Sequence, residues 1–534
     1  MVSTPLKELD HSYTERYNGP RSSKSNQRSG QMSDRVRSTY SGRAILLAAL
    51  VSILVSSPTN ANAQNEATRR PDLIRRSATD TLPDTLNVWV YFRDKGGIEN
   101  QRPYPQTVVS ERSLRRRLRV RPESALIDAT DLPVNQAYVE AIRPLVIQTR
   151  HHSRWLNGVS VQVLKSKLEE ITALPFVREV DTARRYGRTA SAESPRITDY
   201  SVTEDSSVYG QSWTQLRQMN VPALHAEGNC GEGVLIGVLD DGFRRLNHEA
   251  LWNLDIVTTY DFAENKVSVV PSDTLRGGGS HGTMTLSTIA GYKPGRLIGS
   301  AFCASFVLAR TEVVSSETPL EEDNWVAAIE WMDSIGVDIT STSLNYLDFD
   351  PPYRDGSWQE MDGNTTLITR VADMAVSKGI LVVVAGGNTG NTDDFSRNTL
   401  WAPADGDSVI SVGAVDALGT RVSNGYWGSS FGPTTSNPPR IKPDVMAMGY
   451  RVWVANPIGF GTYIYVAGTS FSCPLVAGVA ALLLRDVPDA TPMEIINTLH
   501  ATASNSATPN NFYGWGIVNA LAARDYLRRL KARN

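Results

Sequence analysis

The sequence predicts a doubly wound α/β domain with a mostly parallel sheet, preceded by a small α+β domain. Its length of 534 residues exceeds what one ordinary hydrophobic core holds, so two or more domains are expected. From about residue 210 onward, near-continuous apolar runs alternate with helical patterns, which indicates a parallel sheet with helices on both faces. Before that point the runs are shorter and alternate with polar residues, as in half-buried strands.

The N-terminal region, residues 1–63, reads as a secretory signal. The apolar run "AILLAALVSILV" at 44–55 follows several arginines and precedes the cleavage pattern Ala61-x-Ala63. A spanning helix needs about 20 apolar residues, so an uncleaved membrane anchor is the weaker alternative. Met32 would begin a signal of more ordinary length, and we expect it to be the true start. The protein is therefore expected in the periplasm or the medium, without membrane contact after cleavage.

The small domain is expected over residues 86–186, after a polar linker at 64–85. Strands are predicted at 86–92, 158–164 and 177–181, and helices separate them. The basic run "SERSLRRRLRVRP" is interpreted as a solvated helix face that ends at Pro122, with a nucleic-acid patch as the weaker alternative. A polar, Ser-rich linker at 187–209 follows.

The large domain is expected over residues 210–534. Near-continuous apolar strands are predicted at 233–243, 306–310, 337–344, 380–387 and 408–415. Between them, the segment 318–336 opens with a capping box of Thr318, Pro319 and Glu321 and ends on a glycine. The segment 491–499 repeats that opening. In such a sheet the active crevice lies beyond the carboxyl ends of the strands.

Four polar residues stand at these strand ends or at helix starts. They are Asp240, His281, Asn388 and Ser470. Each has an ordinary structural explanation, since Asp and Asn suit turns, a lone His is often structural, and Ser commonly caps a helix. Together, however, they provide the nucleophile, base, orienting acid and oxyanion donor of acyl transfer, in the known chain order Asp, His, Ser.

The motifs around these residues resemble those of subtilisin-like serine peptidases. The matching stretches are "IGVLDDGF", "SHGT", "AGGN" and "GTSFSCPLVAG", and the likeness extends over about residues 210–530. Residues 156–181 are similar to part of the inhibitory prodomain of that family, which has a ferredoxin-like fold. The resemblance implies a zymogen that cleaves itself within the 187–209 linker.

The resemblance also implies a role for each site residue. Ser470 would be the nucleophile, His281 the base, Asp240 its orienting acid and Asn388 an oxyanion donor. The segment Ser343, Leu344 and Asn345 would pair with the substrate backbone as an added strand. The S1 pocket, which takes the side chain before the scissile bond, would lie between that segment and the turn at 385–390.

Protein or peptide substrates and the chain's own prodomain are the expected partners of a monomeric enzyme. The net charge of −3 gives little support for nucleic-acid binding. Residues 201–534 carry 22 basic against 35 acidic residues, whereas residues 64–200 carry 23 against 17, so the prodomain would dock electrostatically. A catalytically silent peptide-binding protein and an esterase are the alternatives.

No cofactor is expected. The loop at 291–299 lacks any carboxylate or Asn, so the calcium site that many subtilases build there is doubtful, and no other site is identified. Cys230 and Cys303 precede neighbouring predicted strands, which permits a disulfide in an exported protein, and two unpaired cysteines are the alternative. Cys473 is expected to be a buried thiol.

Two further patterns resemble catalytic motifs but are not interpreted as such. The "GSSFG" stretch at 428–432 fits a hydrolase nucleophile pattern but is followed by Pro433, so we expect a structural turn. The "HEALW" stretch lacks the second histidine of a zinc-peptidase motif because Trp252 stands in its place.

Overall fold

The structure is a computed structural model that describes residues 84–98, 103–181, 207–273, 277–350 and 353–533. The predicted signal peptide, nearly all of the first linker and most of the second linker, with its processing site, lie outside these residues.

The N-terminal domain is built on a four-stranded antiparallel sheet of order β2-β3-β1-β4. Its strands are β1 (Thr85–Phe92), β2 (Gln148–Ser153), β3 (Gly158–Leu164) and β4 (Val177–Asp181). Helices α2 (Gln136–Ile142) and α3 (Leu168–Thr172) contribute Ile142 and Ile171 to a core that also contains Val side chains from the sheet. This is the expected α+β, ferredoxin-like arrangement.

The sequence predicted three strands in this domain and missed β2, because the residues of β2 do not alternate between apolar and polar. Its residues that face inward are polar: His151 and Ser153 are buried against α7 (Pro319–Ile335) of the large domain. His151 Nε2 lies 2.8 Å from Asn324 Oδ1, and the Ser153 hydroxyl donates to Glu330. A strand whose buried side meets polar partners gives no hydrophobic pattern.

The interpretation of the basic run as a solvated helix face was also wrong. It forms α1 (Glu111–Arg117), in which Arg116 and Arg117 are completely buried. Both guanidinium groups pair with Asp333 near the end of α7, and Arg117 also pairs with Asp131 at 2.8 Å. Buried arginines are found where carboxylates compensate their charge, and sequence alone did not reveal the distant Asp333.

The large domain contains a seven-stranded sheet of order β13-β12-β11-β10-β5-β9-β6, in which every pair of neighbours is parallel. Its strands are β5 (Leu235–Asp240), β6 (Asp255–Asp261), β9 (Ser305–Arg310), β10 (Ile339–Thr342), β11 (Leu381–Ala385), β12 (Ile410–Val415) and β13 (Val445–Met448). Except for the edge strand β6, these strands are buried along nearly their whole length, which confirms the predicted doubly wound α/β fold.

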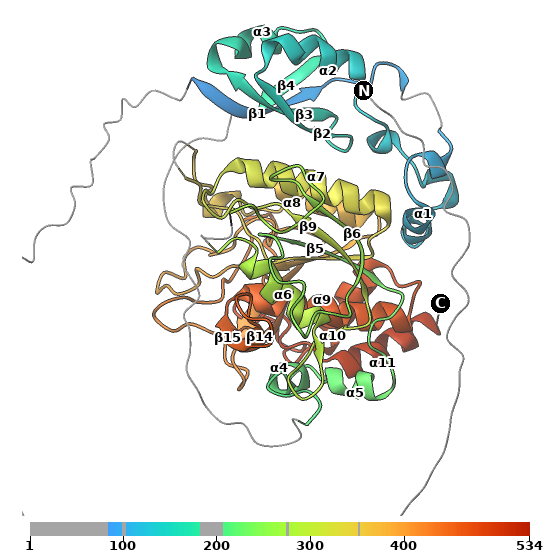
Figure 1. The fold of residues 1–534 in the computed structure, drawn as a ribbon, viewed down its shortest axis with the longest axis vertical. Helices are drawn as coiled ribbons and strands as arrows, with labels where there is room; N and C mark the ends of the chain where they lie inside the picture. Colours follow the sequence, from blue (N-terminus) through green and yellow to red (C-terminus); the bar gives the residue numbers. More distant parts are fainter. Residues whose placement is uncertain (1–83, 99–102, 182–206, 274–276, 351–352, 534) are drawn as a thin grey trace, which may run out of the picture. The chain divides into compact units, whose positions relative to one another are not determined.

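Helices cover both faces of this sheet (Figure 1). Helix α7 and helix α8 (Leu367–Ser377) pack on one face, while α6 (Ser280–Ala290) and α9 (Thr469–Asp486) pack on the other. The C-terminal helix α11 (Ala520–Lys531) packs against α9, and α10 (Pro492–Thr502) packs against α11. The capping boxes predicted at Thr318 and Thr491 are both formed.

Helix α9 is the central helix of the domain. Within the described residues it alone is long and apolar enough to cross a membrane, but 83% of that apolar window is buried inside the protein. It contacts β10, β11, β12 and β13 on the same face of the sheet as α6. Its apolar composition therefore serves the core, and its first turn lies at the carboxyl edge of those strands.

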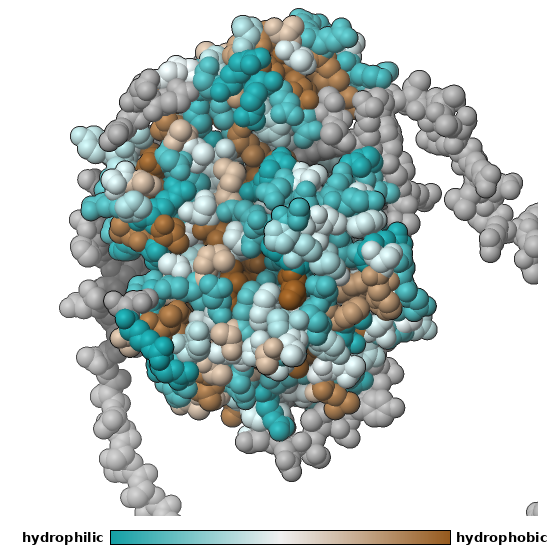
Figure 2. All heavy atoms as spheres, turned by 180° about the vertical axis from the view of Figure 1, so that it is seen from behind, coloured by the Kyte–Doolittle hydropathy of each residue, from teal (hydrophilic) through white to brown (hydrophobic). Residues whose placement is uncertain are grey.

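A disulfide joins Cys230 to Cys303, which precede the paired strands β5 and β9. On the face drawn in Figure 2, apolar side chains gather in separate patches among hydrophilic ones. Separate small apolar patches of this kind are ordinary on a protein surface and indicate no binding site by themselves.

Candidate active site

Asp240 and His281 are joined by a short hydrogen bond. Asp240 ends β5 and is completely buried, and its Oδ1 lies 2.7 Å from His281 Nδ1 in the first turn of α6. The His281 side chain is 30% exposed. Because Nδ1 is the atom that donates to Asp240, the neutral ring carries its free lone pair on Nε2.

The remaining oxygen of Asp240 is also occupied. Thr285 Oγ1 donates to Asp240 Oδ2 at 2.8 Å from one turn further along α6. Gly282 permits this close approach, because a Cβ at that position would collide with the carbonyl oxygen of Gly242. The carboxylate is therefore held by contacts on both oxygens, which fixes the orientation of the imidazole.

Asp241 caps helix α6 rather than taking part in the His281 side-chain contact. Its carboxylate accepts from the backbone N–H of Gly282 at 2.8 Å and of His281 at 3.3 Å. Burial and the adjacent Asp240 charge raise the pKa of Asp241 to about 7. The second Asp of the "DD" pair thus anchors the helix that carries the histidine.

The charges around His281 favour its protonated form. Burial lowers the pKa of His281, but the charge and hydrogen bond of Asp240 outweigh that effect, and Asp241 and Glu312 add to it. The net result raises the pKa to about 9. A histidine in this environment gains a proton readily, which suits the base in a reaction that forms an imidazolium.

Ser470 lies in the first turn of α9, which follows Gly468. Its hydroxyl donates to the carbonyl oxygen of Ser343 at 3.5 Å, and the Ser343 hydroxyl donates to the Ser470 carbonyl oxygen at 2.7 Å. Between the described residues no hydrogen bond joins Ser470 Oγ to His281 Nε2. Catalytic hydrogen bonds are often long or misaligned before substrate binds, so this geometry is compatible with a nucleophile.

Asn388 follows β11 and is fixed by Thr469, the residue before Ser470. The Thr469 backbone N–H and hydroxyl both donate to Asn388 Oδ1 at 3.0 Å. With its oxygen engaged in this way, the side-chain NH2 is the group left to donate to another acceptor. An NH2 donor beside the first turn of a helix is the arrangement that an oxyanion site requires.

The three residues expected to pair with substrate follow β10. Ser343 is buried, Leu344 is half-buried against the α7–α8 core, and Asn345 Nδ2 donates to the Ala385 carbonyl oxygen at 2.8 Å. The β10 ladder ends at Thr342, and the next backbone bridge joins Tyr346 to Ala402. The segment between them is therefore placed at the carboxyl edge of the sheet, next to Ser470.

One group of three carboxylates, Glu312, Glu317 and Glu321, lies close enough to share a cation within the described part of the chain. Burial raises their pKa values, that of Glu312 to about 7 and that of Glu317 to about 9. Glu312 accepts from the hydroxyls of Thr311 and Tyr346, and Glu321 accepts from the N–H groups of Val313 and Thr318. These contacts occupy oxygens of Glu312 and Glu321, and the raised pKa values favour protonated carboxyls, so we assign no metal to the cluster.

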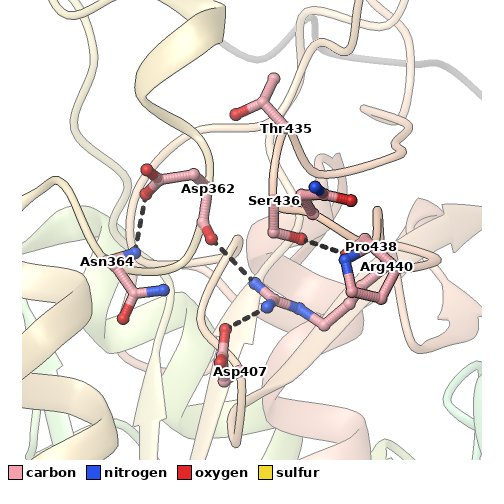
Figure 3. A pocket seen from close by; sticks show the side chains of 8 residues that line it. Asp362, Asn364, Asp407, Thr435, Ser436, Pro438 and Arg440 are labelled. Atoms are coloured by element: carbon pink, nitrogen blue, oxygen red, sulfur yellow. Dashed lines mark hydrogen bonds and ion pairs between the residues drawn. The ribbon is translucent and has the colours of Figure 1, made fainter.

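A separate pocket contains none of the four candidate catalytic residues (Figure 3). Arg440 lies in its wall, pairs with Asp407 at 2.5 Å and donates to the backbone oxygen of Asp362. These contacts tie loops together, and the pocket holds no nucleophile next to a base. It is therefore not the reaction centre.

The remaining sequence interpretations correspond to structural roles. Ser429 and Ser430 of the "GSSFG" stretch are buried, and their hydroxyls accept from the backbone N–H groups of Ala414 in β12 and of Thr389. His248 of "HEALW" lies 2.8 Å from the Thr462 carbonyl oxygen. Cys473 is a buried free thiol whose pKa burial raises to about 12. The hairpin in the 291–299 loop, where a calcium site was considered doubtful, presents Lys293, which pairs with Glu249.

Sequence reasoning missed three residues that position the site: Asp241, Thr285 and Thr469. Thr285 lies four residues after His281, and that helical spacing placed both on the same face of α6. Thr469 precedes the candidate nucleophile directly. Spacing was thus an available signal for Thr285, whereas the Asn388 contact of Thr469 depends on the tertiary structure.

Comparisons with known proteins show which families and relatives this chain is similar to. Residues 231–516 match the family model described as the subtilase family, and residues 87–196 match the peptidase S8 propeptide domain of Bacteroidota. Subtilisin E from Bacillus subtilis is 32% identical over 312 residues, which cover 58% of this chain and 70% of that protein. Subtilisin from Bacillus pumilus is 33% identical over 312 residues, covering 58% and 97%. A solved protease structure from Pseudoalteromonas arctica is 24% identical, with a TM-score of 0.46, and covers 60% of this chain and 99% of that one.

Proposed function

Because the chain belongs to the subtilase family of serine peptidases and carries its propeptide domain, we propose that it is a secreted endopeptidase made as a self-processing zymogen. The observation that carries the proposal is the convergence of Asp240, His281, Asn388 and Ser470 at one edge of the parallel sheet. No cofactor is needed for the chemistry of this set, because it contains a nucleophile, a base and oxyanion donors.

In the first half of the reaction, Ser470 Oγ attacks the scissile carbonyl carbon and its proton passes to His281 Nε2. The carbonyl oxygen becomes an oxyanion that accepts from the Asn388 NH2 and from a backbone N–H at the start of α9. The tetrahedral intermediate then collapses, the C–N bond breaks, and His281 gives its proton to the departing amine. Asp240 stabilises the transient imidazolium.

In the second half, water attacks the carbonyl carbon of the Ser470 ester and gives a proton to His281. A second oxyanion forms at the same donors, the C–O bond to Ser470 breaks, and His281 returns the proton to Ser470 Oγ. The products are the carboxylic acid and the regenerated enzyme.

The N-terminal domain is the proposed intramolecular inhibitor. Asp323 on α7 accepts from Trp89 Nε1 at 2.6 Å and from the Ser160 hydroxyl at 2.5 Å. Together with the contacts of Arg116 and Arg117 to Asp333, these bonds attach the domain through charged, buried groups. The electrostatic docking inferred from sequence is thus proposed to rely on specific pairs rather than on net charge alone.

Export is part of the proposal, and the Cys230–Cys303 disulfide supports it because such bonds persist in oxidising compartments. Peptide or protein substrates and a monomeric state are proposed as well. In this proposal the Ser343–Asn345 segment pairs with the substrate backbone as an added strand.

The decisive experiment compares the full chain with its Ser470→Ala variant. N-terminal sequencing should find the wild type cleaved within the 187–209 linker and the variant unprocessed there. Casein hydrolysis should be lost in the variant by a factor of about 10⁴ or more.

Identical processing and identical casein hydrolysis by the two proteins would overturn the proposal and support a silent, peptide-binding protein. Hydrolysis of esters but not of casein by the wild type would identify an esterase instead.

A further inference from the structure

We propose that Trp401 and Asn345 close the S1 pocket, so that the enzyme selects substrates with a small side chain, such as Ala, Ser or Gly, before the scissile bond. This inference rests on the proposed function. It concerns the space between two segments, Ser343–Asn345 after β10 and Ala385–Thr389 after β11. A substrate strand paired with the first segment would project its P1 side chain into that space.

Trp401 is tied by its backbone to the first of these walls. The next residue, Ala402, exchanges two hydrogen bonds with Tyr346: the Tyr346 N–H donates to the Ala402 oxygen at 2.8 Å, and the Ala402 N–H to the Tyr346 oxygen at 3.2 Å. Tyr346 directly follows Asn345. The Trp401 backbone therefore lies beside the end of the Ser343–Asn345 segment.

The indole of Trp401 reaches the second wall. Its Nε1 donates to Thr389 Oγ1 at 2.9 Å, and a Cβ on Gly387 would lie 3.6 Å from its Cδ1. The Thr389 hydroxyl in turn donates to the Thr399 carbonyl oxygen at 3.2 Å, which fixes the acceptor. Trp401 thus has its backbone beside the first wall and its indole against the second. In this inference the indole takes up the volume into which a large P1 side chain would extend.

The Asn345 side chain also links the two walls. Its side chain crosses to the second wall, where Nδ2 donates to the Ala385 carbonyl oxygen at 2.8 Å. A large P1 side chain would have to break this bond and leave a polar group without a partner, which adds a cost beyond simple steric exclusion. Two independent contacts therefore link the walls.

The test uses peptides that differ only at P1, with Ala, Leu or Phe, and that are cleaved at a single verified bond. For the wild type, kcat/KM is expected to be at least about tenfold higher with Ala than with Phe. Trp401→Gly should raise the ratio of kcat/KM for the Phe peptide to kcat/KM for the Ala peptide by about tenfold or more.

Milder variants cover the case in which Trp401→Gly does not fold. Asn345→Gly removes the crossing side chain, and Thr389→Val removes the acceptor that holds the indole. Each should raise the Phe-to-Ala ratio of kcat/KM. Trp252→Ala, which removes an indole that is 75% exposed, is the matched control and should keep the wild-type ratio.

A wild type that cleaves the Phe or Leu peptide as well as the Ala peptide would overturn the inference and leave the proposed function intact. A ratio unchanged in all folded Trp401, Asn345 and Thr389 variants would overturn it too. If no peptide were cleaved faster by the wild type than by Ser470→Ala, the proposed function itself would fail, and the inference with it.

Discussion

Thr469 holds the side-chain oxygen of Asn388 with two hydrogen bonds of 3.0 Å, one from its backbone N–H and one from its hydroxyl. The same hydroxyl accepts from the Gly387 N–H at 3.2 Å. Neither atom of Thr469 needs to touch substrate for this residue to matter, because it orients the amide that would donate to the oxyanion.

Removing that hydroxyl should slow the chemical step. Thr469→Val keeps the backbone N–H bond but loses the second one, which is a difference of about 1 kcal/mol, or about five- to tenfold in kcat. KM should change little, because the lost interaction acts on the transition state. Thr469→Ser should restore most of kcat. Steady-state kinetics on a peptide decide this, and an increase in KM at unchanged kcat would contradict it.

The pH dependence of activity should report the charges around His281. In the proposed mechanism the neutral His281 ring is the base, so kcat/KM should rise as pH approaches a His281 pKa raised to about 9. The pKa of Asp241 is raised to about 7, so above that pH its charge helps to hold the His281 proton. Asp241→Asn removes that charge and should move the acid limb of the kcat/KM profile to lower pH.

The control for this shift is Asp393→Asn, which removes an exposed carboxylate outside the site. Its profile should match the wild type. An acid limb that stays in place or moves to higher pH in Asp241→Asn would contradict the electrostatic argument.

The sequence was informative where local rules control the structure. Asp240, His281 and Asn388 follow apolar strands or a glycine loop, and the topology of a parallel sheet brings such positions to one edge. The capping boxes at Thr318 and Thr491 are likewise local patterns, visible within four residues.

Tertiary pairing accounts for what sequence reasoning missed. Arg116 and Arg117 look like surface residues until Asp333, more than two hundred positions away, is placed beside them. Strand β2 lacks an apolar pattern because His151 and Ser153 meet polar groups on α7. The periodicity of a segment gives no information about a polar partner that lies in another domain.

Asp333 should control how long the prodomain stays attached after cleavage. Asp333→Asn leaves two buried guanidinium groups without their shared carboxylate, and breaking a buried pair is strongly destabilising, by about 3–5 kcal/mol. In the processed wild type, peptide hydrolysis should appear only after a delay that follows linker cleavage. That delay should shorten markedly in Asp333→Asn.

Gel analysis gives the time of linker cleavage, and a peptide assay on the same samples gives the time at which hydrolysis appears. The difference between these two times is the delay. Glu111→Gln, which removes an exposed ion pair with Arg115 in the same helix, should leave the delay unchanged. A delay equal in wild type and Asp333→Asn would contradict a role for this pair in retaining the prodomain.

The acidic cluster should make the fold less stable at alkaline pH. Burial raises the pKa of Glu317 to about 9, and the neighbouring Glu312 and Asp350 charges add to that effect. Because this value exceeds that of the unfolded chain, the folded state holds a proton that the unfolded state releases between about pH 4.5 and pH 9. The stability associated with Glu317 is therefore present at acid pH and is lost as pH rises through about 9.

Glu317→Gln removes this proton linkage, so the variant should lose less stability than the parent as pH rises. In a Ser470→Ala background, which prevents autolysis, its Tm relative to the parent should increase between pH 5 and pH 9, by about 2 °C or more. Asp393→Asn should show no such trend, because its carboxylate is exposed. A Tm difference that is constant across this range would mean that Glu317 is already ionised in the folded protein at neutral pH.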